Sequence, residues 1–146
     1  MKLRTKPPPS SSASMAELTE MLQRWIELLG EKSAEGGIIL VEGVKDAEAL
    51  RRAGVNGEIL CVKSRQATLA DVLHPLVDVN REVIVLPDFD RRGKQLAGRI
   101  VRYLQGRGGN PNLRFWLRVH GLGASHVKDV EGLIAYLENV KRNTMT

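Results

Sequence analysis

The spacing of apolar residues changes along the chain, and each kind of spacing predicts a kind of element. Near the N-terminus, apolar residues recur at helical intervals and form one stripe. The residues of this stripe are Leu18, Leu22, Trp25, Ile26 and Leu29. The stripe predicts a helix over residues 15–35, which ends at Gly30 or at the Gly36–Gly37 pair.

After residue 36, short apolar runs alternate with amphipathic stretches. The runs predict buried strands over residues 38–41, 58–62, 81–86 and 113–119. The stretches predict helices over residues 44–53, 69–76, 92–105 and 130–140, the last with Asp129 as its N-cap. Apolar strands that alternate with helices are typical of a parallel sheet covered on both faces. We therefore expect an α/β domain over residues 36–142, with a four-stranded parallel sheet, flanking helices and the additional N-terminal helix.

Composition narrows the class of protein. The chain has 146 residues, of which 42% are hydrophobic and 27% are charged, so one packed domain is expected. Its apolar runs are far shorter than the roughly 20 residues of a membrane helix, which predicts a cytoplasmic protein without a membrane partner. The single cysteine excludes a disulfide framework. Residues 1–14 combine basic residues with prolines and serines, which predicts a disordered basic tail.

The basic residues are distributed unevenly. Between Arg91 and Lys128 there are nine lysines and arginines and no aspartate or glutamate, whereas the rest of the chain has 13 basic and 17 acidic residues. A solvated surface usually mixes both signs. A long stretch of one sign favours an anionic partner, above all nucleic acid.

Acidic residues directly follow two of the predicted strands, in the segments Val41-Glu42-Gly43-Val44-Lys45-Asp46 and Val85-Leu86-Pro87-Asp88-Phe89-Asp90-Arg91-Arg92-Gly93. If these strands are neighbours, Glu42, Asp88 and Asp90 converge on the carboxyl edge of the sheet, where α/β proteins bind ligands. Carboxylates at such an edge are the ligands that Mg²⁺ prefers. Gly43 and Gly93 allow tight turns into the following helices. Considered alone, each segment has a simpler interpretation: Glu42-Gly43 as a turn and Asp90 as a helix cap.

These two segments resemble the V-E-G-x-x-D and V-L-x-D-x-D-x-x-G motifs of the Toprim domain, which topoisomerases, bacterial primases, RecR-type recombination proteins and the nuclease that matures 5S ribosomal RNA share. The likeness covers residues 36–140 and implies a Rossmann-like Toprim fold. By this resemblance, Glu42 acts as general acid/base or assists metal binding, and Asp88 and Asp90 coordinate Mg²⁺. Asp46 matches a frequent acid of the family. Without zinc-ribbon cysteines or a tyrosine-bearing topoisomerase domain, the chain is similar to small stand-alone Toprim proteins.

The helix predicted after Asp90 has an apolar arc and a basic arc. The basic residues in and just before this helix are Arg91, Arg92, Lys94, Arg99 and Arg102. We expect them to contact nucleic-acid phosphates, because this helix begins at the acidic edge. A purely solvated face is the alternative.

Together these features predict a Mg²⁺-dependent Toprim protein that cleaves phosphodiester bonds of structured, ribosomal RNA, with Glu42 transferring a proton. RNA is favoured over DNA, and a ribosome or ribosomal protein is a further partner. A non-catalytic RNA- or ribosome-binding protein and a DNA repair or recombination accessory are the alternatives. His126, in a glycine-rich loop, is a second candidate for polarising a phosphate, although such histidines are more often structural.

Overall fold

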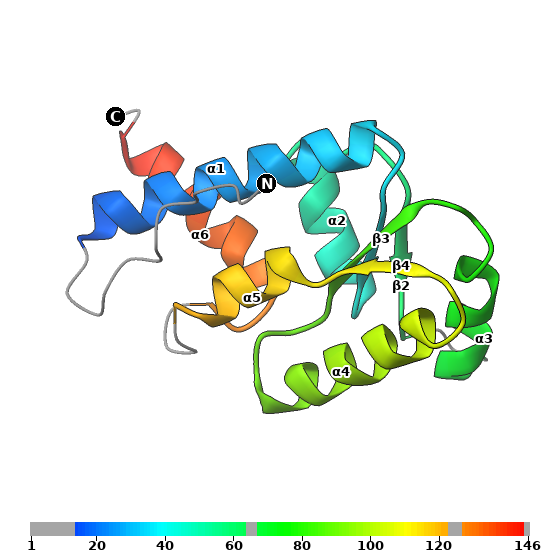
Figure 1. Cartoon of the computed structure of the whole chain (residues 1–146). Coiled ribbons are helices and arrows are strands. Elements are labelled where there is room, and N and C mark those ends of the chain that lie inside the picture. The colour runs from blue at the N-terminus through cyan, green and yellow to red at the C-terminus, as the bar shows by residue number, and fades with distance from the viewer. Residues whose placement is uncertain (1–13, 64–66, 123–126, 145–146) are drawn as a thin grey trace, which may run out of the picture.

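The structure, a computed structural model, describes residues 14–63, 67–122 and 127–144. Its described strands form one parallel sheet in the order β2-β1-β3-β4 (Figure 1). The strands are β1 Ile38–Val41, β2 Ile59–Cys61, β3 Glu82–Leu86 and β4 Asn110–Asn112. The four-stranded parallel sheet expected from the sequence is therefore confirmed.

Helices cover both faces of the sheet. In chain order they are α1 Met15–Ala34, α2 Val44–Arg52, α3 Leu69–Leu73 with the 3₁₀ turn η1 His74–Leu76, α4 Arg91–Gln105, α5 Arg114–His120 and α6 Val130–Thr144. The helices α3 and α4 lie on one side of the sheet, and α1, α2 and α6 lie on the other (Figure 1). Right-handed crossovers produce this division, because the chain moves from β1 to β2 in one direction and from β2 through β3 to β4 in the other. No described helix combines the length and the apolar character that crossing a bilayer requires.

The order of the strands reverses at β1 and β3, which are neighbours although β2 lies between them in the sequence. Their register pairs Ile38 with Val83 and Val41 with Leu86. All four residues are completely or almost completely buried. The two strands therefore end side by side, and the residues that follow Val41 and Leu86 leave the sheet at the same edge.

The N-terminal helix is part of the same core. Leu22 and Leu29 of α1 are fully buried, and Trp25 donates from Nε1 to the carbonyl oxygen of Phe115 at 2.9 Å. The helix passes through Gly30 and ends just before Gly36, whose φ of 102° suits a residue without a side chain. Of the predicted tail, only Ser14 lies within the described residues, and its hydroxyl caps α1 by accepting from the N–H of Glu17.

The predicted location of the fourth strand is wrong. Residues 113–119 lie mostly in α5, and the strand is the shorter segment Asn110–Asn112 just before it. In α5, Trp116 and Val119 are buried at helical spacing, whereas Leu117 is 53% exposed, which an alternating strand pattern does not explain. The turn into α5 is set by Asn112, whose Oδ1 accepts from the N–H of Arg114 at 2.8 Å. Because β4 is an edge strand, it tolerates Pro111.

We expect Leu22→Ala to lower the free energy of unfolding by about 2–5 kcal/mol, because it leaves a cavity between α1 and the rest of the core. Leu28→Ala in the same helix is the matched control, since Leu28 is 47% exposed, and it should change stability by less than about 0.5 kcal/mol. Urea unfolding of both variants measures the difference. Equal losses in the two variants would contradict the packing of α1 described here.

Candidate metal centre

Glu42 joins the ends of the two central strands. The residue is only 7% exposed, because it follows the buried β1 directly. Oε1 accepts a hydrogen bond from the backbone N–H of Asp88 at 3.1 Å, and Oε2 lies 3.3 Å from Nζ of Lys63. A buried carboxylate needs such partners. Glu42 therefore has one contact to the loop after β3 and one to the segment after β2.

The loop that carries Asp88 is held on several sides. Besides the bond from its N–H to Glu42, Asp88 accepts at its carbonyl oxygen from Nε1 of Trp116 at 3.0 Å. The next residue, Phe89, donates its N–H to the carbonyl oxygen of Lys128 at 2.8 Å. The first turn of α4 packs so closely on this loop that a Cβ at Gly93 would overlap the carbonyl oxygen of Asp88. These contacts fix the backbone from which the Asp88 side chain projects.

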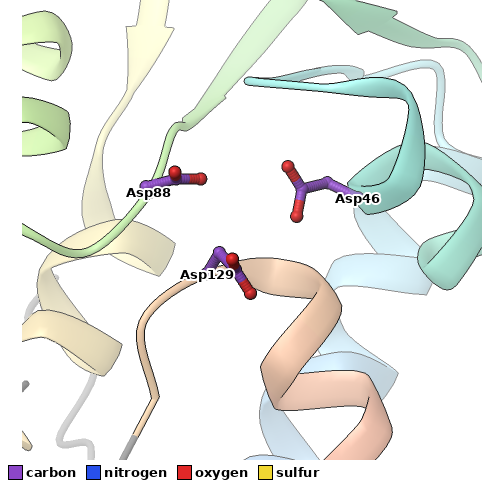
Figure 2. A group of neighbouring side chains, drawn as sticks. All are labelled: Asp46, Asp88 and Asp129. Carbon is purple, nitrogen blue, oxygen red and sulfur yellow. The ribbon is translucent and has the colours of Figure 1, made fainter. Parts of the chain in front are cut away.

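Three aspartates from different parts of the chain meet at this edge. Carboxylate oxygens of Asp46, Asp88 and Asp129 all lie within 4.8 Å of one another. Figure 2 shows the three side chains converging from α2, from the loop after β3 and from the start of α6. Below, these three residues are called the aspartate cluster.

Backbone amides orient two members of the aspartate cluster. Asp46 accepts at Oδ1 from the N–H of Glu131 at 2.9 Å and at Oδ2 from the N–H of Gly43 at 3.2 Å. Asp129 accepts from the N–H of Gly132 at 2.7 Å and so caps α6, which confirms its predicted role as N-cap. The aspartate cluster thus depends on the starts of two helices as well as on the strand end.

The aspartate cluster concentrates negative charge in a partly buried place. Burial, followed by the charges of Glu42, Asp46 and Asp129, raises the pKa of Asp88 to about 7. Burial also raises the pKa of Asp46, although the hydrogen bonds from the N–H groups of Glu131 and Gly43 act in the opposite direction. Without a cation, the site therefore favours protonation of Asp88.

This donor set fits a hard divalent cation. Mg²⁺ takes oxygen ligands at about 2.0–2.1 Å, so two ligands on opposite sides of one ion are about 4 Å apart. The carboxylate oxygens of Asp46, Asp88 and Asp129 come within a similar span. The mutual repulsion of these carboxylates is the second indication of a cation site, because a bound cation would relieve this repulsion.

The other predicted site residues lie at the starts of α2 and α4 and along α4. Asp90 is the N-cap of α4, where its Oδ1 accepts from the N–H of Gly93 at 2.8 Å, and it is not a member of the aspartate cluster. Gly43 is the N-cap of α2. The predicted basic residues lie exposed on α4: Arg91, Arg92, Lys94, Arg99 and Arg102. His126 lies outside the described residues.

From the sequence, Asp129 is predicted as a helix cap and not as a candidate ligand. The position of Asp129 at the start of a predicted helix could have indicated a ligand. In a parallel α/β sheet the helices begin at the carboxyl edge, so their acidic N-terminal residues gather beside the strand ends. Asp46 and Asp129 both occupy such positions, at the third residue of α2 and at the cap of α6.

The sequence matches the Toprim domain family over residues 37–120, which span β1 to α5 and exclude Asp129. The chain therefore belongs to the Toprim family, and it has the nucleic-acid-related, metal-binding function that this family implies.

Relatives of similar length are known as UPF0292 proteins. One from Methanosarcina barkeri is 30% identical over 86% of both chains. Another, from Methanocaldococcus jannaschii, is 34% identical over 81% of this chain and 93% of its own. Among solved structures, a protein from Aquifex aeolicus matches with a TM-score of 0.61 and 26% identity, over 75% of this chain and 95% of its own.

We expect Gly93→Ala to displace the Asp88 loop, because the new methyl group would overlap the Asp88 carbonyl oxygen. The variant should lose about 2 kcal/mol or more of stability and weaken Mg²⁺ binding measured by calorimetry. Gly30→Ala is the matched control, since a Cβ there meets no atom within 4 Å and alanine favours a helix. A Gly93→Ala protein that binds Mg²⁺ like the Gly30→Ala protein would contradict this close packing.

We expect the raised pKa of Asp88 to affect the stability of the metal-free protein. Between pH 4 and 7 the folded state holds a proton on Asp88 that the unfolded state releases, so the contribution of this carboxyl to stability falls as pH rises. Relative to the wild type in EDTA, Asp88→Asn should therefore gain about 1–2 kcal/mol by pH 8, after allowance for solvent screening.

Urea unfolding at a series of pH values measures this difference, and Asp78→Asn at an exposed position is the control. A stability difference between Asp88→Asn and the wild type that does not change from pH 4 to pH 8 would show that burial and the neighbouring carboxylates do not raise the pKa of Asp88.

Proposed function

We propose that the protein is a Mg²⁺-dependent enzyme that cleaves phosphodiester bonds in structured RNA, with ribosomal RNA as the candidate substrate. The observation that carries the proposal is the aspartate cluster at the carboxyl edge of β1 and β3, beside the start of the basic helix α4. A cation site next to a cationic surface suits a phosphate substrate. The bound cation neutralises the reacting phosphate, and the basic side chains of α4 bind the neighbouring phosphates.

Asp46, Asp88 and Asp129 are the proposed ligands of the metal. Bound there, Mg²⁺ would supply Lewis-acid polarisation of a phosphate and neutralise developing negative charge. Asp88 is common to this set and to the set predicted from the sequence, which also included Glu42 and Asp90. Asp90 already accepts from Gly93, so its contribution as a ligand can be tested with Asp90→Asn, which preserves a helix cap.

Glu42 is the proposed proton-transfer group. It lies against Asp88, and Oε2 faces the ammonium end of Lys63, whose side chain is 63% exposed. A carboxylate in this position can accept a proton from water or return one to a leaving oxygen. Its second role is structural, because Oε1 fixes the backbone of Asp88.

The basic side chains of α4 are the proposed RNA contacts. Arg91, Arg92 and Lys94 follow Asp90 in the first turn, and all three are exposed. The N–H groups and dipole of a helix start favour phosphate as well. Contacts of this kind position the RNA backbone without selecting a base sequence.

One observation favours a second candidate, a non-catalytic RNA- or ribosome-binding protein. Both oxygens of Glu42 already have partners, Asp88 and Lys63, as expected of a residue that only supports the fold. In this case the aspartate cluster would hold a structural cation, and binding would depend on α4 alone.

We expect purified protein to cleave labelled ribosomal-RNA precursors in Mg²⁺ and not in EDTA, with plasmid DNA as the competing substrate. Asp88→Asn should abolish cleavage. Glu42→Gln should reduce it by about 10²–10⁴-fold without loss of stability, because glutamine still accepts from the Asp88 N–H but transfers no proton.

The Asp78→Asn protein, prepared in the same way, is the control for a contaminating nuclease. RNA binding without cleavage in the wild type would favour the non-catalytic candidate. Full activity of Glu42→Gln would remove Glu42 from the proton-transfer step.

A further inference from the structure

An open cleft of about 380 Å³ lies between α3 and the C-terminal half of α4. Its lining residues are Leu69, Ala70, Arg99, Arg102, Tyr103 and Arg107. None of these described residues is acidic, and three of them are arginines. The cleft therefore combines a small apolar floor with a concentrated positive charge.

An aromatic ring and a guanidinium group are stacked in this cleft. The Cζ atom of Arg107 lies over the ring of Tyr103, 3.8 Å from the ring centre, and its Nη1 donates to the Tyr103 carbonyl oxygen at 3.2 Å. Arg107 is exposed, whereas Tyr103 is half-buried against the core. The pair thus holds a flat cationic group at the surface, on which another flat ring can stack.

The other two arginines form no ion pair with another described residue. Among the described residues, Arg52 and Arg81 are paired with Glu138 and Glu58, but no ion pair includes an arginine of α4. Gly98 leaves room for Arg102, because a Cβ at Gly98 would lie 3.1 Å from its Nη1. The guanidinium group of Arg102 can therefore lie back along α4.

One face of α4 extends from the aspartate cluster to the cleft. Arg91, beside the aspartate cluster, and Arg102, in the cleft, are separated by three turns, so they share a face and are roughly 16 Å apart. A strand that keeps the stacked form it has in a duplex, with a rise of about 3.4 Å per nucleotide, covers this distance with about five nucleotides.

We propose that this cleft is a second nucleic-acid subsite, which binds an unpaired nucleotide about five positions from the nucleotide at the aspartate cluster. Its Arg99 and Arg102 contact phosphates, and a base stacks on the Arg107–Tyr103 pair. The proposal rests on the proposed action on nucleic acid, and it specifies a substrate with a single-stranded segment. A nucleic acid fits better than an acidic peptide, because only the former supplies a planar ring with every phosphate.

The test measures binding of a ten-nucleotide single-stranded RNA by fluorescence anisotropy in EDTA, so that neither the metal nor cleavage contributes. We expect Arg107→Gln to weaken binding about 5- to 10-fold. Arg24→Gln is the matched control, since it removes an exposed charge from α1 on the other side of the sheet, and it should change affinity less than twofold. The double variant Arg99→Gln/Arg102→Gln should flatten the slope of log K against log salt by about one to two units.

A second readout separates stacking from charge. In the wild type, 2-aminopurine placed at successive positions of the RNA should be quenched at one position, and Arg107→Lys should lose this quenching although it keeps the charge. Equal affinity of Arg107→Gln and Arg24→Gln, or equal competition by decaglutamate and decauridylate, would overturn the subsite. If the wild type cleaves RNA and the Arg107→Gln variant binds RNA as tightly as the wild type, only the subsite is rejected. If RNA binds in the cleft and the wild type cleaves no RNA, only the proposed chemistry is rejected.

Discussion

The bond from the Asp88 N–H to the Glu42 carboxylate links the ends of the two central strands, and the geometry of the aspartate cluster depends on it. This bond forms because β1 and β3 are adjacent and in register up to Val41 and Leu86. Since Glu42 is buried, its carboxylate must find partners within the protein, and the Asp88 loop provides one. The same loop is held by Trp116 of α5 and by Lys128 in the segment before α6, so parts of the chain far from the loop in sequence contribute to the position of one aspartate.

The molecule separates its charges. Carboxylates collect at the carboxyl edge, where burial and then mutual repulsion raise the pKa of Asp88, and cations cover the outer face of α4, which begins at that edge. The carboxylates at the carboxyl edge repel one another, and so do the basic side chains of α4, so each set of like charges by itself destabilises the folded state. A divalent cation at the aspartate cluster and a polyanion on α4 would relieve both, so the two features are physically complementary.

Much of the fold could be predicted from local patterns. Continuous apolar runs indicated β1 and β3, and the amphipathic period of residues 92–105 indicated α4 within one residue of its start. The fourth strand was misplaced because the cluster of apolar residues around Phe115 and Trp116 suits a strand as well as a helix. Burial against the sheet, which exposes Leu117 and covers Trp116, selected the helix.

The sequence by itself determined the class of the protein, and it predicted a site at the carboxyl edge with Asp88 among the acidic residues, together with Glu42 and Asp90. These conclusions follow from motifs whose residues are neighbours in the chain. Only the tertiary structure decided that Asp46 and Asp129 join Asp88, that Asp90 caps α4, and that Arg107 stacks on Tyr103 beside Arg99 and Arg102. The physical reason is that these contacts depend on how α2, α3, α4 and α6 pack on the sheet, and residue spacing along the chain does not specify that packing.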